Sequence, residues 1–530
     1  MLNTGDERPN RLRVWPALAI AIVSAAAIGA LRFAPGEQLP LQYRNFLSML
    51  TAAAAVLAML LWLAFFSRIP VRRRMALLAV SVFVLALPVV VVDHVEFTGD
   101  IEPHVVFRWE KDRSEILQAH REQASRMLQA SAEKSEPPES LAAEWPGFRG
   151  PDRSGVYHGA PIRTNWNEQP PRLLWKQPIG EGHAQIALSG NLAITLEQRG
   201  ESEAVTCYDA RTGGERWVHS YPTHFAETMG GDGPRATPTI DGGKVFALGA
   251  RGRLTCLQAE TGHVEWEVNV LKDEGLANLS WGMSGSPLVL RDLVIVSPGG
   301  PTSALGKAVV AYSRHAGEVV WGLGSAPAGY SSPQVVEIDG VEQIILLEAE
   351  GVAGYQSDGS AELWRYAWPT QQGINCSQPI LVAPNRVLIT AGYTMGCALL
   401  HVTKGDKDVW NVEPVWKQTT LRGKFSTPIA HRGHVYGLDE GILVCINLET
   451  GRREWKQGRY GHGQVLRAGE VLFIQAENGD LAVVAADPEQ YRELGRVAAL
   501  EGRTWNTPAL AAGRAFVRNH REMACFDISR

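Results

Sequence analysis

The stretch Cys207–Trp217 (CYDARTGGERW) recurs twice with little change, as Cys256–Trp266 (CLQAETGHVEW) and as Cys445–Trp455 (CINLETGRREW). Each copy has a short apolar strand, a turn at Thr-Gly and a second strand that opens on a large aromatic residue. Glycine adopts the positive φ that a tight turn requires, so each copy predicts a β-hairpin. Tryptophan at the same place in every copy predicts a side chain that fills the space between neighbouring sheets.

A second hairpin signal lies upstream of each copy. Thr237–Leu248 (TPTIDGGKVFAL) has a strand, an Asp-Gly-Gly turn and an alternating strand. The same kind of opening, a polar residue followed by proline, recurs at Ser286, Ser332, Gln378, Thr427 and Thr507. Each unit therefore holds four short strands in about forty to fifty residues, which is the period of propeller blades.

The positions equivalent to the tryptophan count the units. They are Trp175, Trp217, Trp266, Trp321, Trp364, Trp416, Trp455 and, in degenerate form, Leu494. The last unit ends at Cys525–Ile528 without an outer strand, and Leu173–Pro178 is an outer strand with no unit before it. The sequence therefore predicts an all-β, eight-bladed propeller of four-stranded blades over residues 145–530, closed by pairing the N-terminal strand into the last blade.

Three apolar runs precede the propeller, at residues 14–33, 46–66 and 75–92. Each is long enough, or nearly so, to cross a bilayer core of about 30 Å. A cleaved signal peptide is the alternative for the first run, but two further spans follow it, so we expect a retained anchor over residues 1–94. Lys and Arg stay on the cytoplasmic side of a membrane. Arginines cluster before the first run (Arg8, Arg11, Arg13) and between the second and third (Arg68, Arg72, Arg73, Arg74).

These clusters predict a multi-pass protein of the inner membrane whose propeller lies on the periplasmic side. Residues 95–144 are expected to form a stalk with a charged helix from about Trp109 to Glu133. Its apolar stripe would be Ile116, Ala124, Met127 and Leu128, and a short coiled-coil dimer is the alternative to a single helix. Pro137 and Pro138 end this helix. The segment Trp145–Gly155 (WPGFRGPDRSG) then predicts an ordered loop with two aromatic residues to bury.

The composition fits this organisation. Gly at 53 and Trp at 16 suit many tight turns and one aromatic residue per repeat. The formal net charge of −5 shows no basic excess, so nucleic acid is not expected as a partner.

The repeats resemble those of the pyrroloquinoline-quinone (PQQ) type propellers, and the WPGFRGP opening resembles a subgroup of quinone-binding-like repeat proteins. The resemblance covers about Trp145 to Arg530. The family includes quinoprotein alcohol and glucose dehydrogenases and a non-enzymatic lipoprotein that helps assemble outer-membrane β-barrels. The resemblance implies the fold; its Gly and Trp do structural work with or without a cofactor.

The cysteines predict little chemistry. Cys207, Cys256, Cys445 and Cys525 share one repeat position in different blades and are expected to be buried apolar groups. Cys376 and Cys397 share a blade, and either a disulfide or two free thiols is compatible with their spacing. The alcohol dehydrogenases of the family use adjacent cysteines over the quinone, and this chain has no Cys-Cys pair and no Cys-x-x-Cys-His for covalent haem.

Polar and aromatic residues just before the innermost strands are the candidates for a cofactor site in the central channel. The cations and amides could hold carboxylates and the aromatic residues could stack on a planar quinone. The candidates are Arg235, Trp281, Asn375, Lys424, His462, Trp505 and Asn506. A calcium set with a catalytic Asp is not found, because Asp232, Asp273 and Glu274 are more typical of solvated loops. We therefore predict no catalytic residue and no metal ligand, and a water-filled polar channel is the alternative to a PQQ and calcium site.

Two functions follow. The first is a membrane-anchored scaffold that binds envelope or membrane proteins, with long inserts near Leu271–Ser280, Gly299–Lys307 and Lys404–Pro414 as recognition loops. The alternative is a membrane-bound, PQQ- and calcium-dependent dehydrogenase of an alcohol or sugar. Membrane glucose dehydrogenases of the family also place transmembrane helices before such a propeller. A third interpretation is that the channel binds another small ligand.

Overall fold

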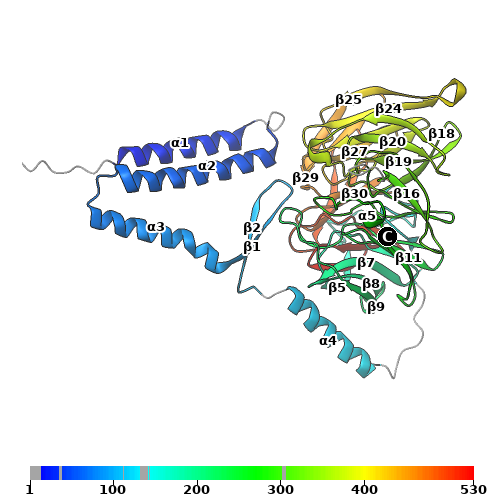
Figure 1. The fold of residues 1–530 in the computed structure, drawn as a ribbon, viewed down its shortest axis with the longest axis horizontal. Helices are drawn as coiled ribbons and strands as arrows, with labels where there is room; N and C mark the ends of the chain where they lie inside the picture. Colours follow the sequence, from blue (N-terminus) through cyan, green and yellow to red (C-terminus); the bar gives the residue numbers. More distant parts are fainter. Residues whose placement is uncertain (1–13, 35–38, 111–112, 132–140, 142–143, 301–305) are drawn as a thin grey trace, which may run out of the picture. The chain divides into compact units, whose positions relative to one another are not determined.

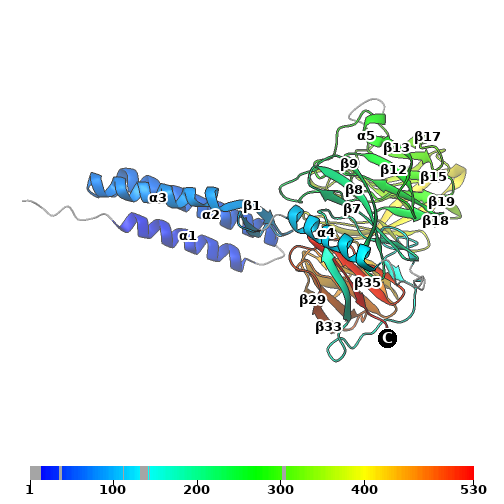
Figure 2. The ribbon, with the colours of Figure 1, turned by 90° about the horizontal axis from the view of Figure 1, so that it is seen from below.

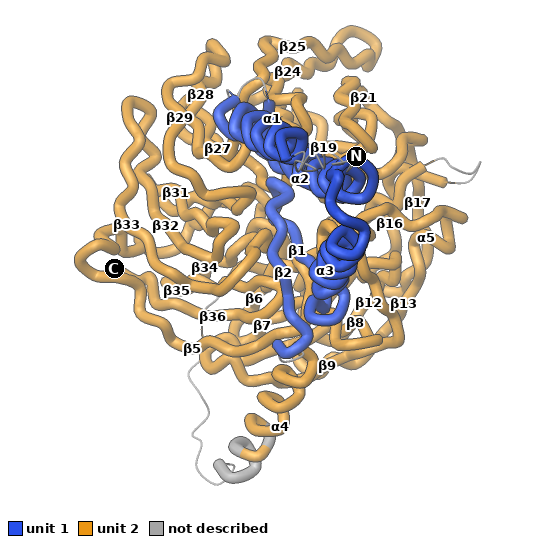
Figure 3. The backbone as a smooth tube through the Cα atoms, turned by 90° about the vertical axis from the view of Figure 1, so that its left-hand side faces the viewer, with its two compact units in different colours: residues 1–111 blue, residues 112–530 orange. Residues whose placement is uncertain are grey.

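The computed structural model describes residues 14–34, 39–110, 113–131, 141, 144–300 and 306–530. The chain divides into two compact units, residues 1–111 and residues 112–530, which Figure 3 colours separately. Arg8, Arg11 and Arg13 lie outside the described residues, as does the middle of the predicted insert at Gly299–Lys307.

The first unit contains three helices long and apolar enough to cross a membrane. They are α1 (Trp15–Phe33), α2 (Leu41–Leu61), which continues as the π-helical turn η1 (Trp62–Phe66), and α3 (Val71–Val91). The second helix begins at Leu41 rather than residue 46, and the third at Val71 rather than residue 75. Each starts directly after a proline, Pro40 or Pro70. The apolar pattern missed these first turns because their residues are largely polar or charged.

A hairpin of β1 (Val92–Phe97) and β2 (Pro103–Phe107) follows the third helix. Its turn is tied to α2 within the same unit, because the Asn45 side-chain amide donates a 2.9 Å hydrogen bond to the Asp100 carbonyl.

The second unit is an eight-bladed propeller, which confirms the predicted fold class (Figures 1 and 3). The strands of each blade are given from the innermost outward. Blade 1 contains β6 (Ala187–Ser189), β7 (Leu192–Arg199), β8 (Ser202–Asp209) and β9 (Glu215–Pro222), and blade 2 contains β10 (Thr239–Asp241), β11 (Lys244–Leu248), β12 (Arg253–Gln258) and β13 (Val264–Asn269). Blade 3 contains β14 (Leu288–Leu290), β15 (Leu293–Val296), β16 (Val309–Ser313) and β17 (Val319–Leu323), and blade 4 contains β18 (Gln334–Ile338), β19 (Val341–Leu347), β20 (Gly351–Gln356) and β21 (Glu362–Ala367).

Blades 5 to 8 continue the ring. Blade 5 contains β22 (Ile380–Ala383), β23 (Arg386–Ala391), β24 (Gly396–Lys404) and β25 (Trp410–Gln418), and blade 6 contains β26 (Ile429–His431), β27 (His434–Asp439), β28 (Ile442–Asn447) and β29 (Arg453–Arg459). Blade 7 contains β30 (Gln464–Ala468), β31 (Val471–Gln475), β32 (Asp480–Ala485) and β33 (Glu493–Ala498), and blade 8 contains β34 (Ala509–Ala511), β35 (Arg514–Arg518), β36 (Glu522–Asp527) and β5 (Arg172–Pro178). Two short strands add to the inner edges of blades 1 and 7, namely β3 (Glu144–Trp145) and β4 (Val156–Tyr157).

Closure of the ring confirms that the first outer strand of the propeller pairs into its last blade, as predicted. The N-terminal strand β5 is the outer strand of blade 8 and pairs antiparallel with β36, with Trp175 opposite Cys525. The same register places Trp217 opposite Cys207 and Trp266 opposite Cys256. The repeated cysteines are therefore buried partners of the tryptophans rather than reactive groups.

The repeated tryptophan packs on the Thr-Gly turn of the following blade. A Cβ atom on Gly262 would lie 2.5 Å from the Trp217 ring, and the Gly262 φ is +71°. The Trp217 indole also donates a 2.9 Å hydrogen bond to the Ala259 carbonyl. This contact between blades requires glycine twice, for its φ and for its missing side chain, and it explains why Thr-Gly and Trp recur together.

Blade 7 departs from the predicted repeat. The residue opposite Val483, at the position that tryptophan holds in most other blades, is Gly495 and not Leu494. A Cβ atom on Gly495 would lie 2.4 Å from the Trp166 Cβ, and the Trp166 ring packs on Phe473 at 5.7 Å. Trp166, from the segment before β5, thus supplies the aromatic residue that the seventh repeat lacks.

The charged helix is α4 (Arg113–Ser131), which is labelled in Figures 1 and 2. It belongs to the same unit as the propeller (Figure 3). Arg121 makes an ion pair of 2.9 Å with Glu215 of β9. Leu117 of this helix is buried, whereas Ile116 of the predicted stripe is 42% exposed. Met127 and Leu128 of that stripe lie outside the residues whose side chains are described.

Short elements occupy the predicted inserts. The insert after blade 2 contains α5 (Val270–Asp273), and η2 (Gln371–Gly373) precedes blade 5. The insert at Lys404–Pro414 was expected to be a loop. It is instead an extension of the β24–β25 hairpin, closed by η3 (Asp406–Asp408).

Candidate functional site in the propeller channel

Hydrogen bonds between neighbouring blades form a belt around the channel. Just before the inner strands of blades 1 to 5, a backbone N–H donates to the side-chain oxygen at the same position of the next blade. The bonds run from Gln185 to Thr237 (3.0 Å), Thr237 to Ser286 (2.9 Å), Ser286 to Ser332 (2.9 Å), Ser332 to Gln378 (3.0 Å) and Gln378 to Thr427 (3.0 Å). The sequence indicated all of these residues except Gln185 as strand openings, but their role as a belt between blades was not predicted.

The loop Trp145–Gly155 enters this belt through two buried arginines. The Arg149 guanidinium donates to the Val465 carbonyl of blade 7 at 3.3 Å, and its backbone N–H donates to the Gln185 side chain of blade 1 at 2.9 Å. Trp145 is also buried, and Phe148 is half-buried.

Arg153 reaches the opposite blades. Its guanidinium donates to the carbonyls of Ser286 (3.1 Å), Pro287 and Pro333 (2.8 Å), which belong to blades 3 and 4. It also contacts the Thr239 hydroxyl of blade 2 at 3.4 Å. Arg149 thus binds blades 7 and 1 and Arg153 binds blades 2, 3 and 4, so that one loop lies against the inner strands of five blades.

Arg149 and Arg153 together are called the arginine plug, and burial lowers the pKa of both. Desolvation lowers the pKa of both Arg149 and Arg153 to about 9. Their guanidinium groups donate mainly to backbone carbonyls, which offsets part of the cost of burying their charges, and the Asp152 carboxylate also favours the charged form of Arg149.

Among the predicted cofactor residues, Arg235 and Trp281 border the same glycine, Gly230. Arg235 donates to the carbonyls of Gly233 (2.6 Å) and Gly231 (2.8 Å), and its guanidinium lies 4.9 Å from the Phe225 ring centre. Burial lowers its pKa to about 10. Trp281 packs edge-on against Tyr330 at 5.9 Å.

The two predicted asparagines lie at opposite sides of the ring. Asn375 donates to the carbonyls of Glu348 (2.7 Å) and Trp368 (3.1 Å) at the junction of blades 4 and 5. Asn506 donates to the carbonyls of Ala184 (2.9 Å) and Gly182 (3.3 Å) at the junction of blades 8 and 1. The side-chain oxygen of each has no hydrogen-bond partner among the described residues. Junctions four blades apart in an eight-bladed ring face each other across the channel.

Lys424 and His462 come together around an acid that was not predicted, Glu440. The Lys424 ammonium lies 3.8 Å from a Glu440 carboxylate oxygen, and a His462 ring nitrogen lies within 4.8 Å of that carboxylate. Glu440 is buried, and neither of its carboxylate oxygens has a hydrogen-bond partner among the described residues. The only signal in the sequence is its place in the Asp-Glu-Gly turn of blade 6.

Trp505 completes an aromatic cluster with Phe425 (4.9 Å) and His183 (5.4 Å), and the Arg503 guanidinium lies 4.4 Å from its ring centre. Its indole donates a 2.8 Å hydrogen bond to Glu477. Trp505 and His462 therefore share two neighbours, because His462 packs on Phe425 and its backbone N–H also donates to Glu477.

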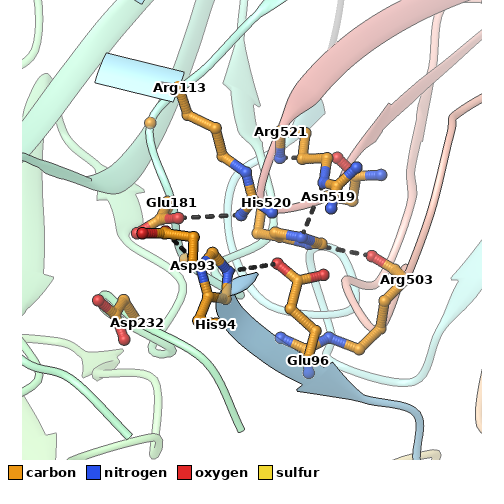
Figure 4. A network of polar contacts seen from close by, with 12 residues as sticks. Asp93, His94, Glu96, Arg113, Glu181, Asp232, Arg503, Asn519, His520 and Arg521 are labelled. Atoms are coloured by element: carbon orange, nitrogen blue, oxygen red, sulfur yellow. Dashed lines mark hydrogen bonds and ion pairs between the residues drawn. The ribbon is translucent and has the colours of Figure 1, made fainter. Parts of the chain in front are cut away.

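Positive charge gathers beside this cluster. Burial, and then the charges of Arg235, Arg503 and His520, lower the pKa of His183 well below its ordinary value. Figure 4 shows Arg503 and His520, whose ring nitrogen contacts the Arg503 carbonyl at 3.2 Å. It also shows Arg113 of α4 paired with Glu181 at 3.0 Å.

A calcium ion takes about six to eight oxygen ligands, largely carboxylates. In the described residues from 113 onward, no three His, Cys, Asp or Glu side chains bring ligand atoms within 4.8 Å of one another. Lys424 and His462 lie beside Glu440, and the side-chain oxygens of Asn375 and Asn506, which accept no hydrogen bond from the described residues, lie at opposite junctions of the ring. These residues do not fit a calcium-bound quinone, and no reaction step is derived from one.

All six cysteines are free thiols in this structure, including Cys376 and Cys397. Burial raises the pKa of Cys376 to about 12, so its thiol stays protonated at neutral pH.

Comparisons with known proteins confirm the resemblance inferred from the repeats. Residues 201–457 match a family described as outer membrane protein assembly factor BamB. A quinone-dependent alcohol dehydrogenase, dehydrogenase subunit, from Komagataeibacter europaeus is 28% identical over 137 residues. That match covers 25% of this chain and only 18% of the relative's length.

The comparison with solved structures found matches at low identity. BamB from Moraxella catarrhalis is 15% identical with a TM-score of 0.49, covering 67% of this chain and 97% of that one. Quinohemoprotein alcohol dehydrogenase from Comamonas testosteroni is 13% identical with a TM-score of 0.49, covering 79% and 84%.

Proposed function

We propose that the protein is a membrane-anchored scaffold of the cell envelope, whose exported propeller binds other proteins and carries out no catalysis. The observation that supports this most is the arginine plug, because Arg149 and Arg153 occupy the channel of the propeller with the protein's own side chains. The surfaces left for function are then the rim and the loops between strands.

The predicted cofactor residues support the same proposal. Arg235, Asn375 and Asn506 each donate hydrogen bonds to backbone carbonyls of the loops around the channel. Groups already bound in this way stabilise the junctions between blades, and a ligand would have to displace those contacts. These residues would bind a quinone only in the alternative function, as a dehydrogenase.

The anchor supports a place in the envelope. Three helices could cross a membrane, and the arginines before Trp15 and between α2 and α3 favour a cytoplasmic position for both segments. We propose a multi-pass protein of the inner membrane with the propeller outside the cytoplasm. Protease added to intact spheroplasts should then remove a C-terminal epitope tag, whereas a tag at the N-terminus should resist it. The reverse pattern would contradict the proposed topology.

The second candidate is a PQQ-dependent dehydrogenase of an alcohol or sugar. The observation in its favour is the similarity of a 137-residue stretch to a quinone-dependent alcohol dehydrogenase subunit. Arg235, Lys424 and His462 would then bind the carboxylates of the quinone, and Trp281 and Trp505 would flank its ring.

Site-specific photo-crosslinking in intact cells tests the scaffold. A photoreactive amino acid replaces Val409, which is 66% exposed beside the tip of the β24–β25 hairpin, or the exposed Lys272 in α5. Arg432, 73% exposed in a short turn of blade 6, serves as the matched control. We expect discrete adducts with envelope proteins at one or both inserts and none at the control. The absence of adducts at every position would contradict the proposal.

A further inference from the structure

The outer strand of blade 3, β17, differs from the outer strands of the other blades. It contains no charged residue (VVWGL), whereas each of the other seven carries at least two. Those charged residues are Arg172 and Lys176; Glu215 and Arg216; Glu265 and Glu267; Glu362 and Arg365; Glu413 and Lys417; Arg453, Glu454, Lys456 and Arg459; and Glu493 and Arg496.

Charges on an edge strand oppose its pairing with another chain. β17 is the last strand of its sheet, so its outer backbone groups have no neighbouring strand in the described part of the chain. Val319 and Val320 are 52% and 55% exposed, although β-branched residues favour strand pairing. A β-bulge occurs between the two outer strands of every blade, so the bulge beside Val320 does not distinguish this edge.

We propose that β17 is the interface of a homodimer, in which the β17 strands of two copies pair antiparallel. Antiparallel pairing of identical strands has two-fold symmetry, the usual symmetry of dimers. If Val320 of one copy lies opposite Val320 of the second copy, Glu318 lies opposite Gly322 of the second copy, because the two positions are equally far from the centre.

Charge complementarity at the ends of the strand supports a second copy as the occupant. The aliphatic chain of Lys307 lies over Gly322, since a Cβ atom there would be 2.8 Å from the Lys307 Cγ. Glu318 and Lys307 are both exposed, and neither forms a close ion pair among the described residues, although the Lys307 charge also acts on the Glu274 carboxylate. Pairing through Val320 therefore brings Glu318 of each copy beside Lys307 of the other, twice in one dimer.

The interface is independent of the channel and of the proposed scaffold function, because it uses the rim of one blade. A scaffold remains a scaffold as a monomer, and a dehydrogenase could also dimerise through this edge. The experiment therefore measures only whether two copies of the chain form a dimer.

The full chain in a mild detergent is measured by mass photometry, together with Val320→Cys under oxidising conditions. Residues opposite each other in antiparallel strands lie within disulfide reach. We expect a dimer for the unmodified chain and a reducible covalent dimer for Val320→Cys. Glu265→Cys is the matched control, because Trp266 and Trp321 occupy the same repeat position; it should remain uncrosslinked.

Three charge variants make the test specific. Val320→Lys should give monomers with an unchanged circular dichroism spectrum, since Val320 is exposed. Glu318→Lys or Lys307→Glu alone should shift dimer dissociation to at least about ten-fold higher concentration, and the double variant should restore it. A monomeric unmodified chain, or a Val320→Cys adduct with a different protein in cells and none with a second copy, would overturn the proposal.

Discussion

Single residues decide how tightly neighbouring blades fit. The tryptophan of one blade lies on the glycine of the next at several junctions, as at Trp175 and Gly213 or Trp416 and Gly451. The contact is steric, and it stabilises the ring only while the glycine has no side chain. Glycines that share the positive φ but face open space are natural controls for this contact.

Gly262→Ala should destabilise the fold more than Gly243→Ala. Both residues have a positive φ, +71° and +75°, so both variants bear the same backbone strain of about 1–2 kcal/mol. Only at Gly262 does the new methyl group meet the Trp217 ring, which adds about 1–3 kcal/mol of overpacking. Urea unfolding of the full chain, followed by tryptophan fluorescence, measures the difference. Equal midpoints for the two variants would refute the steric role of the tryptophan.

A buried ion network at Asp439 should make stability depend on pH. Burial alone would raise the Asp439 pKa, but hydrogen bonds from Arg422 (2.8 Å) and Lys456 (2.6 Å) outweigh burial, and the pKa is lowered. Its contribution is therefore complete above the unfolded pKa of about 3.9 and is lost as the pH falls through the folded value.

Asp439→Asn should lower the free energy of unfolding at pH 7, and its difference from the unmodified chain should shrink below about pH 4. Thermal unfolding at a series of pH values checks this, with the 82% exposed Asp292→Asn as control. A difference that stays constant from pH 7 to pH 3 would show that the charge of Asp439 is not what stabilises the network.

At the scale of elements, segments outside the repeats complete the ring. β5 supplies the outer strand of blade 8, and Trp166 fills the place that Gly495 leaves in blade 7. The loop Trp145–Gly155 supplies the arginines that bind the inner strands. The segment before blade 1 is thus part of the propeller. Substitutions that remove a buried side chain from this segment should lower the free energy of unfolding as much as such substitutions inside a blade.

Trp166→Ala should cost about 3–5 kcal/mol, because a buried indole that packs on Phe473 leaves a cavity. Trp109→Ala is the control, since that indole is 69% exposed and should change stability little. Denaturant unfolding of both variants provides the comparison. If the two variants were equally stable, Trp166 would not be the missing tryptophan of blade 7.

Arg153→Met should cost about 1–3 kcal/mol for the buried carbonyls that it leaves without a donor. Arg432→Met, in an exposed turn, is the matched control. Hydrogen exchange should show faster exchange at the starts of the inner strands of blades 3 and 4, to which Arg153 binds. Unchanged exchange there would contradict the role of Arg153 as a plug.

At the scale of the molecule, the repeats predicted the blade number and the closing strand, because Thr-Gly and Trp mark the same position of nearly every unit. Leu494 was misassigned because the residue that pairs with Val483 is Gly495, which has no side chain to mark the repeat, and because Trp166 is distant in sequence. The channel was harder to predict. Arg149 and Arg153 were visible only as part of a loop, and nothing local in the sequence reveals which groups of five blades they bind.

The site residues show the same limit. Position before an inner strand brings His462 and Trp505 together, because both contact Phe425 and Glu477. It does not indicate whether that residue is available to a ligand. Asn375 and Asn506 donate to backbone carbonyls on opposite sides of the ring, and this depends on contacts between blades that no single repeat contains.

Calorimetric titration of the full chain in detergent with PQQ and Ca²⁺ tests the central claim most directly. A channel filled by Arg149 and Arg153, without a calcium set, predicts no heat of binding at micromolar concentrations, for the unmodified chain and for Arg235→Ala and Lys424→Ala alike. Calcium-dependent binding at micromolar or lower concentration that is lost in either variant would contradict the claim and establish the quinoprotein alternative.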